Sequence, residues 1–168
     1  MAARDVRKNL TINVDGRGYA GQLDEFNAPK LVQKVEEYRA GGMNAPVELN
    51  LGMEKLEADF SLIQYSRDVL SLFGVVDGAQ VPLTVREVLE SYDGTITPVV
   101  HVMRGKLKEV DPGTSKAGEL NPIKFGIALS YYRLQHGGVV VQEIDVENMI
   151  HIVNGVDVLA AQRAALGL

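Results

Sequence analysis

Carboxylates are the side chains of this chain best suited to catalysis. They are plentiful, and the candidates are Glu36, Glu37, Glu48, Glu57, Asp59, Glu143 and Asp145. A pair of acids can hydrolyse a glycosidic bond when an apolar pocket keeps one protonated and the other stays charged. No local pattern in the sequence marks such a pocket. A solvated polar face of a sheet is therefore the better interpretation of these acids.

Histidine and cysteine usage argues against a metal centre. His101, His136 and His151 are the three histidines, and none has a second histidine or an acid at metal-ligand spacing on one element. The chain has no cysteine, which excludes disulfides and thiolate chemistry and is typical of a cytoplasmic protein. No serine lies in a nucleophile elbow, and no Walker-type phosphate loop is present. We expect structural histidines, no metal, no cofactor and no enzyme activity.

A glycine motif near the N-terminus matches the dinucleotide-binding fingerprint. Residues 16–21 read Gly-Arg-Gly-Tyr-Ala-Gly. That motif binds a pyrophosphate only where a helix begins directly after it. The following residues, 22–29, have no helical stripe and end at Pro29. Turn glycines in a hairpin are the better interpretation.

Length and charge are those of one ordinary globular domain. The chain has 168 residues, 46% of them hydrophobic, and a net charge of −5. We expect a single domain over residues 1–168, with residues 1–9 as an N-terminal arm. The negative charge argues against general nucleic-acid binding. No apolar run approaches the ~20 residues of a membrane span, and no signal peptide is evident, so we expect synthesis and assembly in the cytosol and no membrane binding.

The clearest structural pattern lies between residues 47 and 62. Apolar residues alternate with polar ones in two runs, which puts all the apolar side chains of a strand on one face of a sheet. The phase changes at Gly52-Met53-Glu54, which requires a turn or a bulge. We expect a hairpin whose apolar face packs on the core of the subunit and whose polar face is rich in carboxylates. The apolar positions are Val47, Leu49, Leu51, Leu56, Ala58, Phe60 and Leu62.

Alternation and turn signals predict several more strands and two short helices. The strands are expected near residues 10–14, 19–23, 81–91, 96–110, 123–131 and 139–144. One helix follows Ser66 and ends at Gly74, and a second follows an Asp157 cap and ends before Gly167. Residues 31–39 are ambiguous, but Leu31, Val35 and Tyr38 stand at helical spacing and favour a short helix over a strand.

Three stretches of the chain are distinctive in combination and order. The first comprises residues 28–31 (APKL) and 37–43 (EYRAGGM), and the second comprises 103–113 (MRGKLKEVDPG) and 116–119 (KAGE). The third comprises 131–134 (YYRL), 143–145 (EID), Asn148, 154–157 (NGVD) and 166–168 (LGL). Together they resemble the major tail tube protein of contractile-tailed bacteriophages and the tube protein of R-type pyocins. The likeness runs from about residue 10 to the last residue.

This resemblance implies an architecture and a function. The fold would be mainly β, a β-sandwich or barrel subunit with about two short helices. Subunits would form hexameric rings that stack into a hollow tube inside a contractile sheath, each lending two hairpins to one large β-barrel around the channel. Residues 31–40 would then be a strand of the channel wall, which overrules the helix. The family has no catalytic activity and no cofactor.

The resemblance also implies partners and sites. The partners are further copies of the chain, the tail sheath, the baseplate or spike, the tail terminator and the tape-measure protein, with DNA as non-specific cargo in a virion tail, or ions in a pyocin-like particle. A channel wall with a net negative charge would repel phosphates and let DNA slide without sticking. The expected lumen-facing residues are Glu48, Asn50, Lys55, Glu57 and Asp59, with Lys124, Ser130 and the strand at 96–103 as weaker candidates. The expected inter-subunit residues are Tyr38, Arg39, Gly41, Gly42, Met43, Asp111, Pro112 and Gly113. The loop at residues 111–121 and the termini are expected to contact other rings or the sheath.

Two other functions remain open at the level of the sequence. One is a monomeric β-barrel module that binds a small ligand, and the other is a hydrolase that uses paired carboxylates. A binding module stays monomeric and buries a pocket, whereas a tube subunit forms rings at raised concentration.

Overall fold

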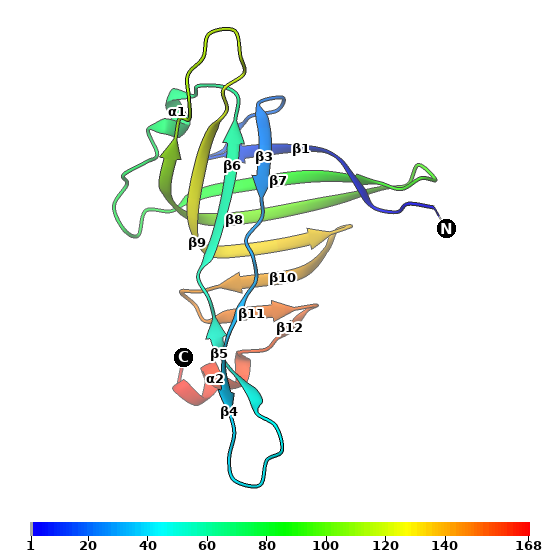
Figure 1. The fold of residues 1–168 in the computed structure, drawn as a ribbon, viewed down its shortest axis with the longest axis vertical. Coiled ribbons are helices and arrows are strands. Elements are labelled where there is room, and N and C mark those ends of the chain that lie inside the picture. The colour runs from blue at the N-terminus through cyan, green and yellow to red at the C-terminus, as the bar shows by residue number, and fades with distance from the viewer. Residues whose placement is uncertain (1) are drawn as a thin grey trace.

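The computed structural model describes residues 2–168, which are built mainly from antiparallel strands (Figure 1). The two helices are α1 (Arg67–Leu70) and α2 (Ala160–Leu166). The strands are β1 (Val6–Val14), β2 (Arg17–Gly18), β3 (Leu23–Asn27), β4 (Gln33–Tyr38), β5 (Val47–Met53), β6 (Leu56–Leu62), β7 (Val81–Glu90), β8 (Ile96–Asp111), β9 (Ile123–His136), β10 (Val139–Asp145), β11 (Ile150–Val153) and β12 (Val156–Asp157). The expected mainly β fold with two short helices is confirmed.

Ten strands form one branched sheet, and β4 and β5 form a separate two-stranded sheet. The main path runs β12-β11-β10-β9-β8-β7-β1-β2. The branch arises because β9 is long: its residues 123–129 pair with β6, and its residues 131–136 pair with β10. Strand β3 adds to the free edge of β6. The sheet therefore has a second arm, β3-β6-β9-β8, that diverges from the first.

The two arms pack against each other as layers around one core. Phe26 on β3 contacts His101 on β8, with ring centroids 5.2 Å apart, so the β3–β6 arm covers the inner face of β7 and β8. Phe60 and Phe125 stack at 5.2 Å in the middle of the core. The largest fully buried side chains are Phe60, Phe125, Ile12, Leu62, Leu83, Met103, Leu107, Ile123 and Ile127. The alternating apolar side chains of β6, β7 and β9 thus point into the core, as the sequence predicts.

Gly105 marks a close approach of backbones within this core. The register of β8 on β9 shifts between Arg104 and Gly105, and a Cβ at Gly105 would lie 2.1 Å from the carbonyl oxygen of Ala128. We expect Gly105→Ala to lower the free energy of unfolding by about 1–3 kcal/mol, because the strands must separate to admit the methyl group. Denaturant unfolding measures this. Gly18→Ala is the matched control, since its Cβ meets nothing closer than Asn13 at 4.0 Å. Equal midpoints for the two variants would contradict the prediction.

A buried polar cluster crosses the inner face of β7, β8 and β9. His101 Nδ1 lies 3.0 Å from the Tyr132 hydroxyl, and His101 Nε2 lies 3.5 Å from Glu87 Oε2. Arg7 Nε approaches the same carboxylate at 3.6 Å. The hydrogen bond with His101 holds the pKa of Glu87 below its ordinary value, against the opposing effect of burial. Burial raises the pKa of Tyr132 to about 12. His101 is thus a structural histidine, as expected from the sequence.

Glu87 makes the stability of the fold depend on acid pH. Because its pKa is lower folded than unfolded, its contribution is complete above the ordinary glutamate pKa of 4.5 and is lost as pH falls through the folded value. We expect the melting temperature of the wild type to fall more steeply below pH about 4.5 than that of Glu87→Gln. Thermal melts from pH 7 downward, at constant ionic strength, measure the difference. Parallel curves for the two proteins would exclude a role for Glu87.

The sequence predictions for residues 31–39 and for the pairing of β5 with β6 are wrong. Residues 31–39 do not form a helix, because residues 33–38 pair as β4 with β5. The strand implied by the resemblance is therefore confirmed, in shorter form. The two strands between residues 47 and 62 do not pair with each other: β5 pairs with β4, and β6 pairs with β3 and β9. The phase change at Gly52, where φ is +114°, marks the passage from one sheet to the next.

Smaller differences concern the helices and the N-terminus. Ser66 precedes α1, but its hydroxyl makes no cap and instead lies 3.2 Å from the Tyr19 hydroxyl. The N-cap of α2 is Leu159 rather than Asp157, and Gly167 ends that helix at φ +75° as expected. The strand expected at 19–23 is displaced to β2 and β3. Within the expected arm at residues 1–9, the strand β1 already begins at Val6 and pairs with β7.

Candidate functional site

A two-stranded ribbon projects from the body of the molecule, beyond α2 (Figure 1). We call residues 33–53, which comprise β4, β5 and the turn between them, the β4–β5 ribbon. Every strand residue in it is exposed except Met53, and Val47, Leu49 and Leu51 are 46%, 46% and 54% exposed. The expectation that the apolar face of β5 packs on the subunit's own core is wrong. A two-stranded ribbon is marginal alone, and its open edges are ready to pair with another chain.

The register of the ribbon sorts its side chains onto two faces. Glu37 lies opposite Glu48, and Val35 lies opposite Asn50, so these four share one face. Like charges directly opposite each other destabilise an isolated sheet. The other face presents Tyr38 opposite Val47 and Glu36 opposite Leu49. The ribbon thus has an acidic face, with the lumen candidates Glu48 and Asn50, and a largely apolar face, with the inter-subunit candidate Tyr38. The sequence alone did not place Glu37 on the same face as Glu48, because that depends on the register of the two strands.

The remaining ribbon candidates form its turn. Arg39 Nε donates to the carbonyl oxygen of Met43 at 3.3 Å, and the amide of Met43 donates to Ala40 at 3.2 Å. Gly42 has φ +88°, a left-handed conformation that glycine adopts readily. Arg39, Gly41, Gly42 and Met43 are therefore brought together at the far end of the ribbon.

The candidates Lys55, Glu57 and Asp59 lie on the body, on the polar face of the β3-β6-β9-β8 arm. Glu57 bonds both Lys108 and Lys55, and the bond from Lys108 is the main cause that lowers its pKa to about 2. Asp59 accepts from Asn27 at 2.6 Å and lies 3.7 Å from Lys124. We call this set the paired-charge face: Asn27, Lys55, Glu57, Asp59, Lys108 and Lys124. Its three lysines outnumber its two acids, so the expected negative balance is not a property of this part of the surface.

The ribbon and the paired-charge face form one continuous structure. The amide of Glu54 donates to the carbonyl oxygen of Val32 at 2.9 Å, which links the β4–β5 pairing to the β3–β6 pairing. Figure 1 shows β4 below β3 and β5 below β6. The candidates Asp111, Pro112 and Gly113 lie elsewhere: they begin the long loop at the end of the molecule opposite the ribbon (Figure 1). There the Gly113 amide donates to Asp111 Oδ1 at 2.9 Å.

A groove of about 670 Å³ lies between the base of the ribbon and the β10–β11–α2 region. Its walls are mainly apolar, with Met53, Leu56, Leu129, Ile144 and Leu159 among them. This is the place where a small-ligand module would bind its ligand. The residues described, 2–168, hold no group of three or more side chains arranged to bind a metal ion.

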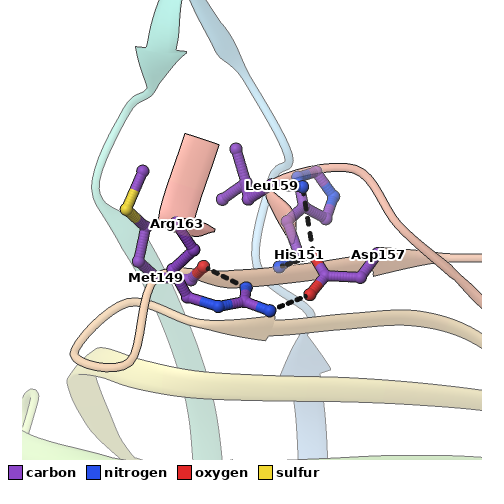
Figure 2. Close-up of polar contacts among 5 residues, drawn as sticks. All are labelled: Met149, His151, Asp157, Leu159 and Arg163. Carbon is purple, nitrogen blue, oxygen red and sulfur yellow. Dashed lines mark hydrogen bonds and ion pairs between the residues drawn. The ribbon is translucent and has the colours of Figure 1, made fainter. Parts of the chain in front are cut away.

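Helix α2 is fixed beside this groove by Arg163 (Figure 2). Its guanidinium donates to the carbonyl oxygen of Met149 at 2.9 Å and to Asp157 Oδ2 at 2.7 Å. Asp157 also accepts from the Leu159 amide at 3.0 Å, so one carboxylate joins the start of the helix to its middle. The bond with Arg163 is the main cause that lowers the pKa of Asp157. The polar contacts of Arg163 therefore support the structure rather than a reaction.

Among residues 2–168, no helix has the length and apolar character needed to span a membrane.

Taken together, the fold and these surfaces are those of a β-rich subunit without a recognisable catalytic centre among residues 2–168, with a two-stranded ribbon that its own body does not cover. Comparison with known proteins agrees with this class. A family model described as "Phage tail tube protein FII" matches residues 5–167. The chain is 36% identical over 172 residues to the tail tube protein of Escherichia phage P2, covering 100% of both chains. It is 31% identical over 152 residues to the major tail tube protein of Serratia phage KSP20, covering 90% of this chain and 88% of that one.

The chain belongs to the phage tail tube protein family. It is a structural, non-enzymatic component of the phage virion tail, and it associates with itself and with other tail proteins. The family resemblance, the absence of enzyme activity and the location expected from the sequence are confirmed.

Proposed function

We propose that this chain forms hexameric rings that stack into the inner tube of a contractile tail, around a channel for DNA. The observation that carries the proposal is the uncovered β4–β5 ribbon. Rotation about a ring axis brings β4 of one copy beside β5 of the next, and these run antiparallel, so the open edges pair as the ring closes. The largely apolar face with Tyr38, Val47 and Leu49 is then covered by neighbouring copies, together with the turn at Arg39, Gly41, Gly42 and Met43.

The channel wall in this proposal consists of two hairpins per subunit. One is the long hairpin of β3–β4 and β5–β6, and the other is β8–β9. This assignment is supported by the β3-β6-β9-β8 arm of the sheet, to which both hairpins contribute strands. One face of that arm packs in the core, and its other face is polar. Glu48, Asn50, Lys55, Glu57 and Asp59 would line the lumen. Each lysine of the paired-charge face is paired with a carboxylate, which weakens its attraction for phosphates, and the acidic face of the ribbon repels them, so DNA passes without sticking.

The remaining surfaces are assigned to the other tail proteins. The loop at residues 111–121, with Asp111, Pro112 and Gly113, is exposed at one end of the subunit and is assigned to the adjacent ring. Specific partners are the sheath, the baseplate or spike, the tail terminator and the tape-measure protein, with DNA as non-specific cargo. The chain folds as one domain over residues 1–168. Its assembly takes place in the host cytoplasm. In a pyocin-like particle the same channel would conduct ions.

Negative-stain microscopy of the purified chain tests the proposal. We expect rings or tubes as protein concentration rises, or after addition of sheared tail fragments from the same phage as seeds. The alternative, a monomeric ligand-binding module, is favoured only by the apolar groove at the base of the ribbon. A clean monomer at every concentration, with and without seeds, would contradict the tube and favour the module.

A further inference from the structure

Three arginines lie on neighbouring strands of the layer opposite the paired-charge face. Arg86 on β7, Arg104 on β8 and Arg133 on β9 alternate with residues that point into the core, such as His101, Met103 and Tyr132. Alternation therefore places the arginines on the outer face of the sheet. In register, Arg86 lies opposite Val100, Arg133 opposite Val102, and Arg104 opposite Tyr131. We call these six residues the arginine face.

None of the three arginines has an ion-pair partner among residues 2–168. The lysines of the paired-charge face, by contrast, all have carboxylates within 4.0 Å. The Nε of Arg133 is also buried without a hydrogen-bond partner. A buried donor left unsatisfied carries a free-energy cost, and the fold gives the Nε of Arg133 no internal partner in return for its burial.

The nearby carboxylates are engaged by other groups. Glu143 lies opposite Arg133 in register, yet it accepts a hydrogen bond from the Tyr131 hydroxyl at 2.8 Å. Asp145 accepts from the amide and the side chain of Asn148, at 3.1 and 2.7 Å. The guanidinium of Arg104 stacks 4.2 Å above the ring of Tyr131, which fixes its plane. Arg104 is thus held in place, and none of the three arginines has its charge paired within the described residues.

We propose that the arginine face binds an acidic segment of the sheath protein that encloses the tube. The proposal rests on the proposed function: if the paired-charge face borders the channel, the opposite layer of the sandwich faces outward. Guanidinium groups bind carboxylates through two parallel hydrogen bonds, and Val100 and Val102 supply an apolar floor between them. Lysines would also attract an acidic segment, but an ammonium group does not form the two parallel hydrogen bonds that a guanidinium forms with a carboxylate.

The test is co-sedimentation of assembled tubes with purified sheath protein from the same phage. In Arg86→Glu/Arg104→Glu tubes we expect unchanged tube formation and at least tenfold weaker sheath binding. Arg67→Glu on α1, compared with Arg104→Glu alone, is the matched control, because Arg67 is an exposed arginine that also lacks an ion pair among the described residues. It should bind sheath as the wild type does.

Other outcomes overturn the proposal in distinguishable ways. Wild-type sheath binding by the double variant excludes the arginine face, and loss of tube formation assigns it to contacts between copies. Retention of duplex DNA that depends on these arginines assigns it to nucleic acid. If the wild type forms no tubes, the proposed function fails, and binding of the free subunit to immobilised sheath protein still decides this proposal. If the double variant does not fold, Arg104→Gln replaces it in this binding measurement as a milder change.

Discussion

Leu49→Asp and Leu51→Asp are expected to abolish tube assembly while the free subunit stays folded. Both leucines are about half exposed on a ribbon that does not pack against the core, so their replacement costs the monomer little. In the tube each would be covered by a neighbour, and burying a leucine contributes about 1.5–3 kcal/mol. A buried unpaired aspartate adds a further penalty. Because the loss recurs at every contact around a ring, we expect no rings at concentrations tenfold above those that suffice for the wild type.

Negative-stain microscopy and sedimentation velocity measure assembly, and thermal melts measure the fold. Val139→Asp and Val156→Asp are matched controls, because these valines are 61% and 65% exposed but lie outside the ribbon. They should assemble normally. If the leucine variants still form tubes, the ribbon is not the principal contact. If their monomers melt at a much lower temperature, the ribbon supports the fold itself.

The strands of the core were predictable because their environment is set by the chain itself. Phe60 and Phe125 alternate with polar residues, and both strands lie with one face in the core. The β4–β5 ribbon was not predictable in this way. Its Val35 and Tyr38 face no core, so a chance helical spacing outweighed a weak alternation. In the proposed tube, the side chains of this segment pack against neighbouring copies, and the core of a single chain does not set their pattern.

Alternation also shows which face a residue takes but not which strand it pairs with. The two runs between residues 47 and 62 were correctly recognised as strands, yet β6 pairs with β9, far along the chain. The same limit applies to the candidate surface. Glu57 was identified from its strand, but its partner Lys108 is 51 residues away. The arginine face was missed for this reason too, because its three arginines meet only through the pairing of three strands.

Glu57→Lys/Asp59→Lys tubes are expected to assemble but to hold DNA in the channel. Both acids are partly exposed and lie outside the core, so the fold does not depend on them. In the wild type these two acids form ion pairs with the three lysines at 55, 108 and 124. The double variant removes two negative charges, adds two positive ones and frees all three lysines. A lumen with this charge neutralises phosphates and releases their counterions, so binding falls steeply as salt rises.

Co-sedimentation of assembled tubes with labelled DNA, at several salt concentrations, measures retention. Glu57→Gln/Asp59→Asn removes the acids without adding charge and should retain less DNA than the lysine variant. Glu90→Lys/Glu147→Lys places the same added charge outside the paired-charge face and should behave as the wild type does. Assembly that fails only in the Glu57/Asp59 variants would mean that these residues contact other subunits. Normal assembly without DNA retention would mean that the paired-charge face does not border the channel, and the arginine face would then lose its outward position as well.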